Sequence, residues 1–252
     1  MHVHPNGNVE ITQICLLAGK IMLASGAETY RVEDTMMRIA DAYGYENSHS
    51  YVTPTGIIFA INGAVSTTRL FRIATRSTDL QKVTLVNDIS RAITRGELAP
   101  EEAYKKLKRI DSANLAYPVW LQIAAAAISS GCFAIMFRGT WPDFLPALIA
   151  GGVGFVSYIY VHRLIPIKFF AEFMAATITG LLSYFCYQAG LGNELDKIII
   201  SAVMPLVPGL VITNAVRDLM AGHLVSGLSK GAEAFLTAFA IGAGIAFVMS
   251  IY

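Results

Sequence analysis

Charged residues are scarce in the second half of this 252-residue chain, and two of them end an interrupted apolar segment at 195–222. The segment is long enough to cross a bilayer. Spanning helices tolerate such breaks where protein or a water-lined cavity surrounds them, and many transporters bind substrate there. We therefore predict that this segment binds a small substrate, whose carboxylate is drawn in by an arginine. The predicted residues are Pro205, Pro208, Gly209, Thr213, Asn214, Arg217 and Asp218. Proline is also common in spanning helices, so a structural kink is the alternative.

Five further ionisable residues are candidates for gating or coupling: Glu28, Arg31, Glu33, Glu172 and His223. Helical spacing makes Glu28 and Arg31 neighbours, as are Arg31 and Asp34, so an ion-pair ladder on a helix surface is the alternative for the first group. A lone loop histidine is more often solvated than proton-carrying. For the remaining charges of the apolar half we favour interfacial anchors and mutual ion pairs, and these are Lys168, Lys230 and Glu233.

The residue patterns typical of enzymes are missing from the sequence. It contains no Gly-x-Ser-x-Gly elbow, no metal-spaced histidine cluster and no phosphate loop. Cys15, Cys132 and Cys186 are too far apart for a metal motif, and we expect all three to be buried thiols. We predict no catalytic residue, metal or cofactor. A hydrolase-like enzyme remains an alternative, with His49 and a Ser/Thr-rich hairpin as its candidates, and a structural membrane scaffold is a third class.

Composition divides the chain in two. Of its 37 charged residues, 25 lie in the first 112 positions and 12 in the last 140. This asymmetry predicts a soluble domain at 1–112 and a membrane domain at 113–252. The net charge of +1, without a basic run interleaved with aromatics, argues against a nucleic-acid partner. The dense basic cluster before the first apolar span is expected to face lipid headgroups, and consists of Lys105, Lys106, Lys108 and Arg109.

The first domain is predicted to be a cytosolic α+β domain of ααβαα type with a β-hairpin. Apolar periodicity predicts a helix at 9–23. Ser25 with Glu28 resembles a capping box that opens a second helix, which Gly44 stops. Strands at 57–61 and 64–73 flank Asn62-Gly63, whose type I′ turn would place Ile61 opposite Ala64 and Phe59 opposite Ser66. Two more helices follow, one capped by Thr78 and ended by Gly96, the other running from Pro100 to about Asp111.

The second domain is predicted to be α-helical, with five transmembrane helices at 118–137, 144–162, 168–189, 195–221 and 229–251. The first ten residues carry no secretory pattern, so we expect the N-terminal domain in the cytoplasm. Lysine and arginine then lie mainly on the inner side, which places the C-terminus outside. Five glycines should permit close helix packing: Gly151, Gly152, Gly154, Gly242 and Gly244.

Two stretches of the chain are familiar: SGAETYRVEDTMMRIADAYG near the start and PGLVITNAVRDLMAGHLVSGLSKGAEA near the end. Together they resemble the threonine/serine exporter family, which includes two-subunit relatives implicated in dicarboxylate export. The resemblance covers roughly residues 10–250. The positions that match the family's two motifs are Gly26, Glu28, Arg31, Glu33, Pro208, Gly209, Asn214, Arg217, Asp218 and Gly222.

The resemblance implies export of a small amino or carboxylic acid, such as threonine, serine or succinate, across the cytoplasmic (inner) membrane. Fused family members carry about five further spans, so this chain resembles the split form that works with a second small membrane subunit. An odd number of spans without an internal repeat likewise calls for another polypeptide or a second copy of the chain. We predict alternating access driven by the proton gradient or by the gradient of the substrate. The sequence offers no ATP site.

Overall fold

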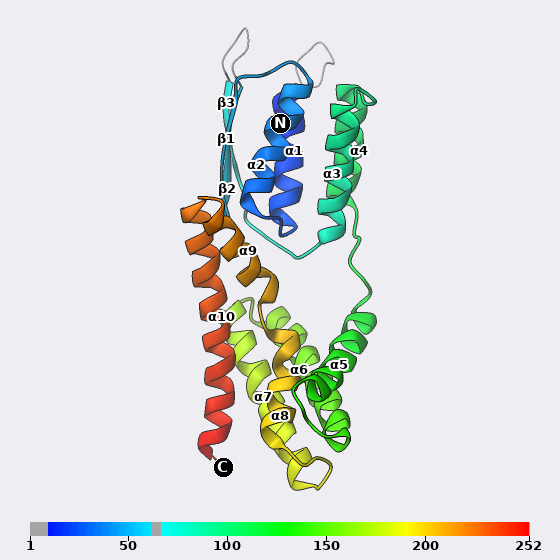
Figure 1. Cartoon of the computed structure of the whole chain (residues 1–252), viewed down its shortest axis with the longest axis vertical. Coiled ribbons are helices and arrows are strands. Elements are labelled where there is room, and N and C mark those ends of the chain that lie inside the picture. Colours follow the sequence, from blue (N-terminus) through cyan, green and yellow to red (C-terminus); the bar gives the residue numbers. More distant parts are fainter. Residues whose placement is uncertain (1–9, 62–66, 252) are drawn as a thin grey trace. The chain divides into compact units, whose positions relative to one another are not determined.

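The computed structural model describes residues 10–61 and 67–251, which form two compact units (Figure 1). The first unit comprises Met1–Ala116 together with Leu210–Gly231. The second comprises Tyr117–Gly209 together with Ala232–Tyr252. Two helices, α9 (Gly209–Met220) and α10 (Leu224–Ile251), contribute residues to both units. Segment 210–231 is therefore part of the same compact unit as the N-terminal residues.

The first unit begins with two helices, α1 (Ile11–Ala24) and α2 (Thr29–Ala42), where apolar periodicity predicted them. The predicted capping box at Ser25 is wrong, because the Ser25 amide still donates to the carbonyls of Ile21 and Met22 and so belongs to the end of α1. Glu28 is the N-cap of α2 instead, three residues later than expected. Gly44 follows the end of α2 with a φ of 87°, a conformation that favours glycine.

Three strands, β1 (Ser48–Thr53), β2 (Gly56–Ile61) and β3 (Thr67–Arg72), form an antiparallel sheet in that order. The predicted hairpin register is wrong, because Ile61 pairs with Thr67 and Phe59 with Arg69. The turn predicted at Asn62-Gly63 lies outside the described residues. Strand β1 was not predicted. Its hairpin with β2 turns through Pro54 and Thr55, so the unit follows a ααβββαα order.

Two further helices, α3 (Leu80–Thr94) and α4 (Pro100–Ser112), complete the N-terminal part of the unit. The N-cap of α3 is Asp79 rather than Thr78, since the Asp79 side chain accepts a hydrogen bond from the Lys82 amide. Helix α4 begins with proline, as predicted. The inner face of the sheet and the apolar faces of all four helices share one core, whose largest fully buried side chains include Phe59, Ile14, Met36 and Leu107.

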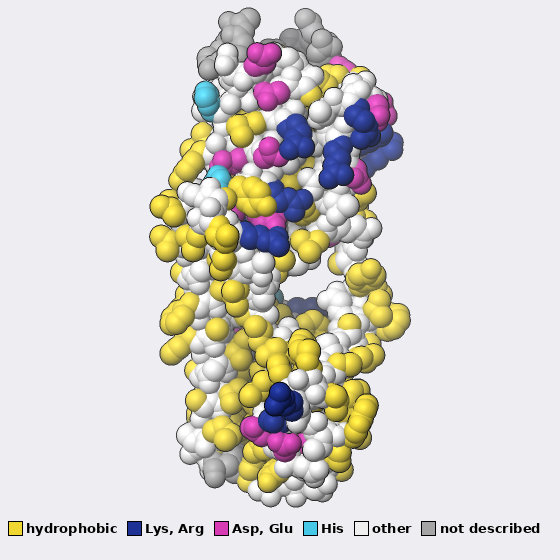
Figure 2. Space-filling view, viewed as in Figure 1, with side chains coloured by type: hydrophobic (Ala, Val, Ile, Leu, Met, Phe, Trp, Pro, Cys, Tyr) yellow, Lys and Arg dark blue, Asp and Glu magenta, His cyan; other side chains and the backbone are white. Residues whose placement is uncertain are grey.

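The second unit contains α5 (Val119–Met136), α6 (Trp141–Leu164), α7 (Lys168–Gln188) and α8 (Leu195–Val203). In the described part of the chain, four helices are long and apolar enough to cross a membrane. The number is five if α8 and α9 count as one broken span. The face shown in Figure 2 agrees, because hydrophobic side chains dominate the second unit and charged ones gather on the first. The chain is a multi-pass membrane protein.

Small residues let the helices of the second unit approach closely. A Cβ at Gly151 would overlap the Ser130 hydroxyl, and one at Gly154 would overlap the Thr179 hydroxyl. Gly152 and Gly244 are also in tight contact with neighbouring helices, as expected. The prediction is wrong for Gly242, where an added Cβ would meet nothing within 4 Å.

One buried carboxylate of this unit, that of Asp143, has its hydrogen bonds satisfied by nearby backbone amides. The Asp143 side chain, which is fully buried, accepts hydrogen bonds from the amides of Thr140, Asn193 and Glu194. It thereby caps the start of α6 and holds the loop before α8. Among the cysteines, Cys15 and Cys186 are buried, but Cys132 is exposed on α5, so the prediction of a buried thiol is wrong there.

Candidate functional site

The two familiar stretches meet in the first unit, around the start of α2. Asp218 of α9 is completely buried, and its carboxylate accepts hydrogen bonds from the Thr29 amide and the Thr29 hydroxyl, both at 2.9 Å. Lys230 of α10, which is 5% exposed, donates to the same carboxylate at 2.7 Å. Lys230 also donates to the Ala27 carbonyl and the Thr29 hydroxyl. A buried ion pair is thus completed by neutral hydrogen-bonding groups.

Asp218 acts as the cap of α2 although it lies far away in the sequence. The N-cap residue Glu28 makes no side-chain capping bond to its own helix. The carboxylate of Asp218 instead satisfies the Thr29 amide, one of the donors that the first turn of a helix leaves unpaired. A negative charge at this end is also favoured by the helix dipole. The arrangement fastens α9 to the N-terminal part of the unit.

Glu28 is free to bind two arginines. Its Oε1 lies 2.5 Å from Arg217 Nη1 and its Oε2 lies 3.1 Å from Arg31 Nη1. Burial by itself raises the pKa of Glu28, but hydrogen bonds from its own backbone amide and from Arg217, with the charge of Arg31, outweigh burial and lower the pKa. The spacing correctly predicted the Glu28–Arg31 pair, whereas Asp34 pairs with Arg38 at 2.6 Å.

Asn214 and Glu33 join α9, α10 and the sheet. Asn214 Nδ2 donates to the Gly26 carbonyl at 2.8 Å, and Gly26 has a φ of 91° in the turn before α2. The outer edge of β1 is closed at Val52, whose amide donates to Glu33 and whose carbonyl accepts from Ser226 of α10. His223 Nδ1 lies 3.7 Å from Glu33 Oε1. Burial raises the pKa of Glu33 despite its hydrogen bond from Val52 and the nearby His223.

We call the group at the start of α2 the α2–α9 network, defined as Glu28, Thr29, Arg217, Asp218 and Lys230. Two of its members were not predicted as site residues. Lys230 was grouped with the interfacial anchors and mutual ion pairs, and Thr29 was not considered. A lysine in an otherwise apolar helix was the available indication for Lys230, because such a charge needs a buried partner. Thr213 lies on α9 in the same unit.

The break after α8 is local and belongs to the second unit. Helix α8 ends at Val203 and a 3₁₀ turn, η1 (Met204–Leu206), contains Pro205. Val207 is extended, with φ −64° and ψ 130°, and Pro208 directly precedes Gly209. Proline was expected to displace carbonyls near Ser201 and Met204. The Ser201 carbonyl accepts from Met204 and the Met204 carbonyl accepts from Val207, so short-range bonds of 3₁₀ type satisfy both.

Glu172 of α7 is, like Asp143, a buried acid of the second unit, with 3% exposure. Its Oε1 accepts from the Thr237 hydroxyl at 3.2 Å, and Lys168 Nζ lies 4.0 Å away. Lys168 makes a closer ion pair with Glu233, in which Nζ lies 2.8 Å from Oε1. This agrees with the mutual ion pairs expected for these residues. The other oxygen, Oε2, is buried without a hydrogen-bond partner among the described residues. One half of this carboxyl group is therefore left for a proton or a ligand.

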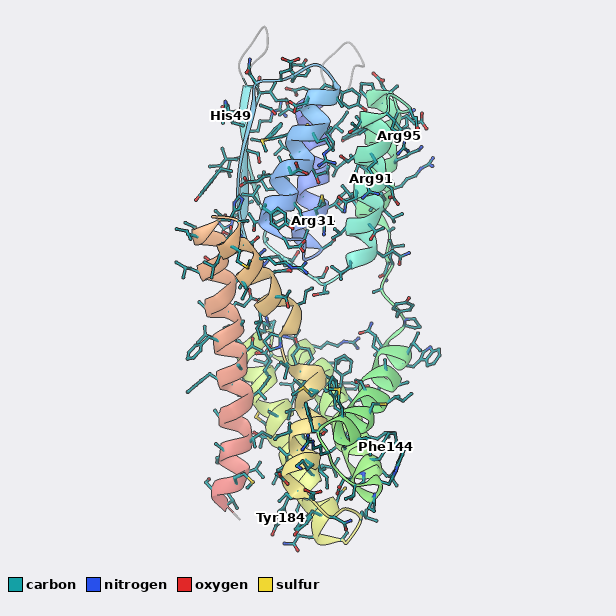
Figure 3. The ribbon with its side chains drawn as sticks, in the orientation of Figure 1. Arg31, His49, Arg91, Arg95, Phe144 and Tyr184 are labelled. Carbon is teal, nitrogen blue, oxygen red and sulfur yellow. The ribbon has the colours of Figure 1, made fainter. Side chains whose placement is uncertain are left out.

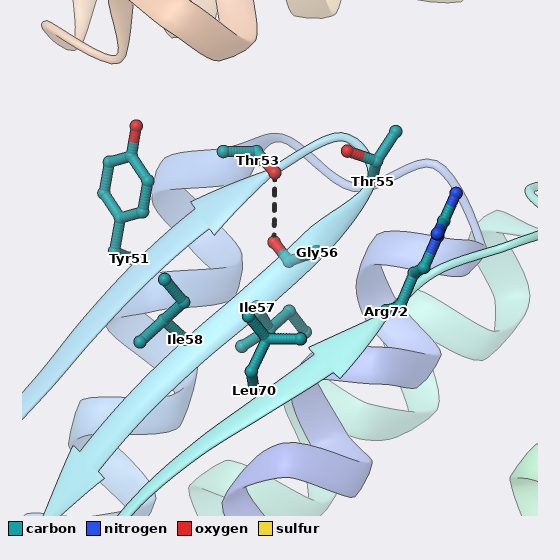
Figure 4. A pocket seen from close by; sticks show the side chains of 8 residues that line it. All are labelled: Tyr51, Thr53, Thr55, Gly56, Ile57, Ile58, Leu70 and Arg72. Carbon is teal, nitrogen blue, oxygen red and sulfur yellow. Dashed lines mark hydrogen bonds between the residues drawn. The ribbon is translucent and has the colours of Figure 1, made fainter.

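The residues proposed for an enzyme do not converge. His49 lies on β1 at the outer side of the sheet (Figure 3). A cavity of about 360 Å³ opens on that side, with Tyr51, Ile58 and Leu70 in its lining (Figure 4). Arg72 is the single charged residue among the eight that line it. Within the described ranges there is no group of three or more His, Cys, Asp or Glu side chains suited to a metal ion.

Comparison with known proteins matches residues 13–252 to the family described as "Putative threonine/serine exporter". A protein of Klebsiella aerogenes named "Probable succinate transporter subunit YjjP" is 27% identical over 96% of this chain and 94% of its own length. The protein of the same name in Escherichia coli K12 is 26% identical over 96% of this chain and 94% of its own length.

A longer relative is matched over part of its length. The "Probable threonine/serine exporter" of Mycobacterium tuberculosis is 25% identical over 91% of this chain but only 44% of its own length. No solved structure matches the chain.

Proposed function

This chain belongs to the threonine/serine exporter family, and from that premise we propose that it is the subunit of an exporter of small amino or carboxylic acids. The observation that carries the proposal is the family match over residues 13–252, which includes every described helix that is long and apolar enough to cross a membrane. The names of the relatives point to succinate, threonine or serine as the cargo. Alternating access is the mechanism that a broken spanning segment supports best.

We assign the recognition of the substrate's carboxylate to Arg217. Its side chain is 56% exposed although it binds Glu28, and guanidinium carries five donors in a fork that suits carboxylates. A substrate carboxylate can therefore bind beside Glu28 or take its place. In this proposal the Glu28–Arg217 pair is a gate, with Arg31 holding Glu28 when Arg217 is engaged. Asp218 and Asn214 position α9, and the turn at Pro205, Pro208 and Gly209 gives the segment its break.

Glu172 is proposed as the proton carrier. A carboxyl group inside a membrane helix bundle is costly unless it is paired or protonated, and such groups often form proton relays. The unpartnered Oε2 is a place for a proton, and Thr237 and Lys168 on the other side keep the side chain in position. Protonation and release at this site would couple export to the proton gradient.

A second, small membrane subunit is proposed as the partner, or else a second copy of the chain. The support is that two relatives with which this chain aligns over 94% of their length are named as subunits. The mycobacterial relative extends well beyond the matched part. We place the complex in the cytoplasmic membrane, with the N-terminal residues in the cytoplasm and the C-terminus outside, because lysine and arginine would then lie mainly inside.

The experiment is an efflux assay in cells that express the full chain with its small partner. Cells are loaded with succinate, threonine or serine, and the intracellular acid is measured over time. Export should fall at least tenfold for Arg217→Ala while the amount of membrane-inserted protein stays the same. Arg163→Ala is the matched control, since Arg163 is exposed at the end of α6, and should export normally. Equal efflux with and without the chain for all three acids would contradict the proposal.

A further inference from the structure

A polar cavity of about 150 Å³ lies between α2 and α3 in the first unit. Its lining includes three arginines, which come from both helices: Arg31, Arg38 and Arg91. Figure 3 shows Arg31 and Arg91 on these two neighbouring helices. The cavity is separate from the outer face of the sheet, and none of its residues belongs to the α2–α9 network.

The lining carries a surplus of positive charge. Asp34 is its one carboxylate, and it pairs with Arg38 at 2.6 Å. Arg31 has Glu28 as its partner at 3.1 Å. Arg91 makes no ion pair with any residue that the structure describes. Guanidinium groups that converge on one cavity are well suited to a carboxylate or phosphate, because their donors can bind two oxygens at once.

Two neutral residues add hydrogen-bonding capacity. Asn87 lines the cavity with an amide that can donate. Ser90 also lines it, is 3% exposed, and has a hydroxyl without a partner in the described part of the chain. A buried hydroxyl left without a partner is unfavourable, and rotation of the side chain offers it to an acceptor in the cavity. The unpartnered hydroxyl is evidence for a ligand that is independent of the arginines.

We propose that this cavity is a binding site for a small oxyanion, held by Arg31 and Arg91 with Ser90 and Asn87 as neutral donors. Its volume of about 150 Å³ admits a phosphate or a short carboxylic acid. The negative charge of the Asp34 carboxylate repels an anion and so lowers the affinity of the cavity for it. Inorganic phosphate and a free carboxylic acid both present the negatively charged oxygens that such a site would bind.

Arg31 links the cavity to the α2–α9 network. It donates to Glu28, and Glu28 also accepts from Arg217. An anion that engages Arg31 competes with Glu28, which is then left to Arg217 alone. Occupancy of the cavity would therefore strengthen the Glu28–Arg217 pair. This consequence for gating rests on the proposed function, whereas binding itself does not.

The test is isothermal titration of the purified full-length chain in detergent, with sodium phosphate and sodium succinate as probes and sodium chloride at equal ionic strength as reference. We expect saturable binding of at least one probe. Arg91→Gln should weaken it at least tenfold. Arg95→Gln is the matched control, because Arg95 lies one turn further along, outside the cavity, and pairs with Glu97. It should change the affinity less than twofold, and Asp34→Asn should strengthen binding.

Ser90→Ala separates a ligand site from a structural role. The hydroxyl has no partner within the described residues, so its removal should leave the thermal midpoint unchanged while weakening anion binding at least threefold. Binding of phosphate alone or of succinate alone supports the site and identifies which kind of oxyanion it takes. No saturable binding up to about 10 mM, or equal losses for Arg91→Gln and Arg95→Gln, would overturn it. A chain that binds the anion and fails to export contradicts the proposed function and leaves this site standing.

Discussion

Asp218 joins three helices through one carboxylate. It accepts from the first residue of α2 and from Lys230 of α10, and it lies on α9 itself. Both charged groups are almost completely buried, so each depends on the other to offset the cost of leaving water. The hydroxyl and amide of Thr29 complete the coordination. Such a group stabilises a particular arrangement of helices, and removing one partner leaves a buried charge.

We predict that Asp218→Ala lowers the free energy of unfolding by about 3–5 kcal/mol, the usual effect of removing one partner of a buried ion pair. Chemical denaturation in detergent, followed by circular dichroism, measures the change. Asp41→Ala is the matched control, because Asp41 is exposed, and should alter the free energy by no more than about 0.5 kcal/mol. Similar losses of unfolding free energy in the two variants would show that the buried Asp218 carboxylate does not stabilise the fold as proposed.

The pKa shifts of Glu28 and Glu33 are opposite, so the two residues should give the stability of the fold opposite dependences on pH. The lowered pKa of Glu28 means that its ionised form is favoured by folding, so its contribution is present above the ordinary value of 4.5 and is lost as pH falls through the folded value. Relative to the parent, Glu28→Gln should therefore become less stable as pH rises through this window. The raised pKa of Glu33 costs stability as pH rises through its folded value. Glu33→Gln should become relatively more stable there.

Denaturation curves of the two variants and the parent between pH 3 and pH 7 test these signs. The two difference curves should run in opposite directions with pH. Parallel curves would mean that Arg217 and Arg31 do not lower the pKa of Glu28 in the folded chain.

Local spacing predicted contacts within a helix but not those between distant segments. The Glu28–Arg31 pair follows from positions three residues apart. Glu28–Arg217 and Thr29–Asp218 each join residues 189 positions apart, which no periodicity encodes. The resemblance marked most of these residues as a set without saying that they touch. They come into contact because both segments belong to one compact unit.

At the scale of elements, the close packing of α6 depends on glycine residues. A Cβ at Gly154 would overlap the Thr179 hydroxyl of α7, while one at Gly242 of α10 would meet nothing within 4 Å. We predict that Gly154→Val lowers the free energy of unfolding by about 1–3 kcal/mol, the cost of forcing volume into a packed interior. Gly242→Val in the same protein should be close to neutral. Thermal denaturation of both variants in detergent measures the difference, and equal midpoints would contradict the close approach of α6 and α7.

Helices were more predictable than strands. Apolar periodicity located α1 to α3 to within a few residues, because a face buried in one core repeats every 3.6 residues. The proline and two glutamates at its start located α4. Strand β1 was missed, since His49, Tyr51 and Thr53 face outward and Pro54 follows directly. The predicted register of β2 and β3 was wrong, since Ile61 pairs with Thr67 rather than with Ala64. Turn chemistry predicts a register only when the loop length is known.

Across the whole molecule, composition predicted a charged part and an apolar part. It could not predict that Leu210–Gly231 belongs to the compact unit of the N-terminal residues. That segment is apolar enough to resemble part of a span, and its polar residues Asn214, Asp218 and Lys230 acquire their meaning from partners far away in the sequence. A segment of this kind connects a polar unit to a membrane unit through the covalent chain.

The proposed coupling of export to proton movement requires the membrane unit as a whole. We predict that Glu172→Gln, reconstituted with the partner subunit, no longer responds to an imposed pH gradient, while exchange of substrate on the two sides continues. Thr237→Val should weaken the response less, since it removes a single hydrogen bond to Glu172 Oε1. Flux of labelled acid into vesicles with and without the gradient measures both. An unchanged response in Glu172→Gln would show that the proton travels elsewhere.

The most direct measurement is counterflow in proteoliposomes that contain the purified chain with its small partner. Vesicles are preloaded with unlabelled succinate, threonine or serine, and uptake of the same labelled acid is followed. We predict transient accumulation of at least one acid, which is lost in Arg217→Ala and kept in Arg163→Ala. Protein-free rates of uptake for every acid, in vesicles where both polypeptides are inserted and folded, would contradict it.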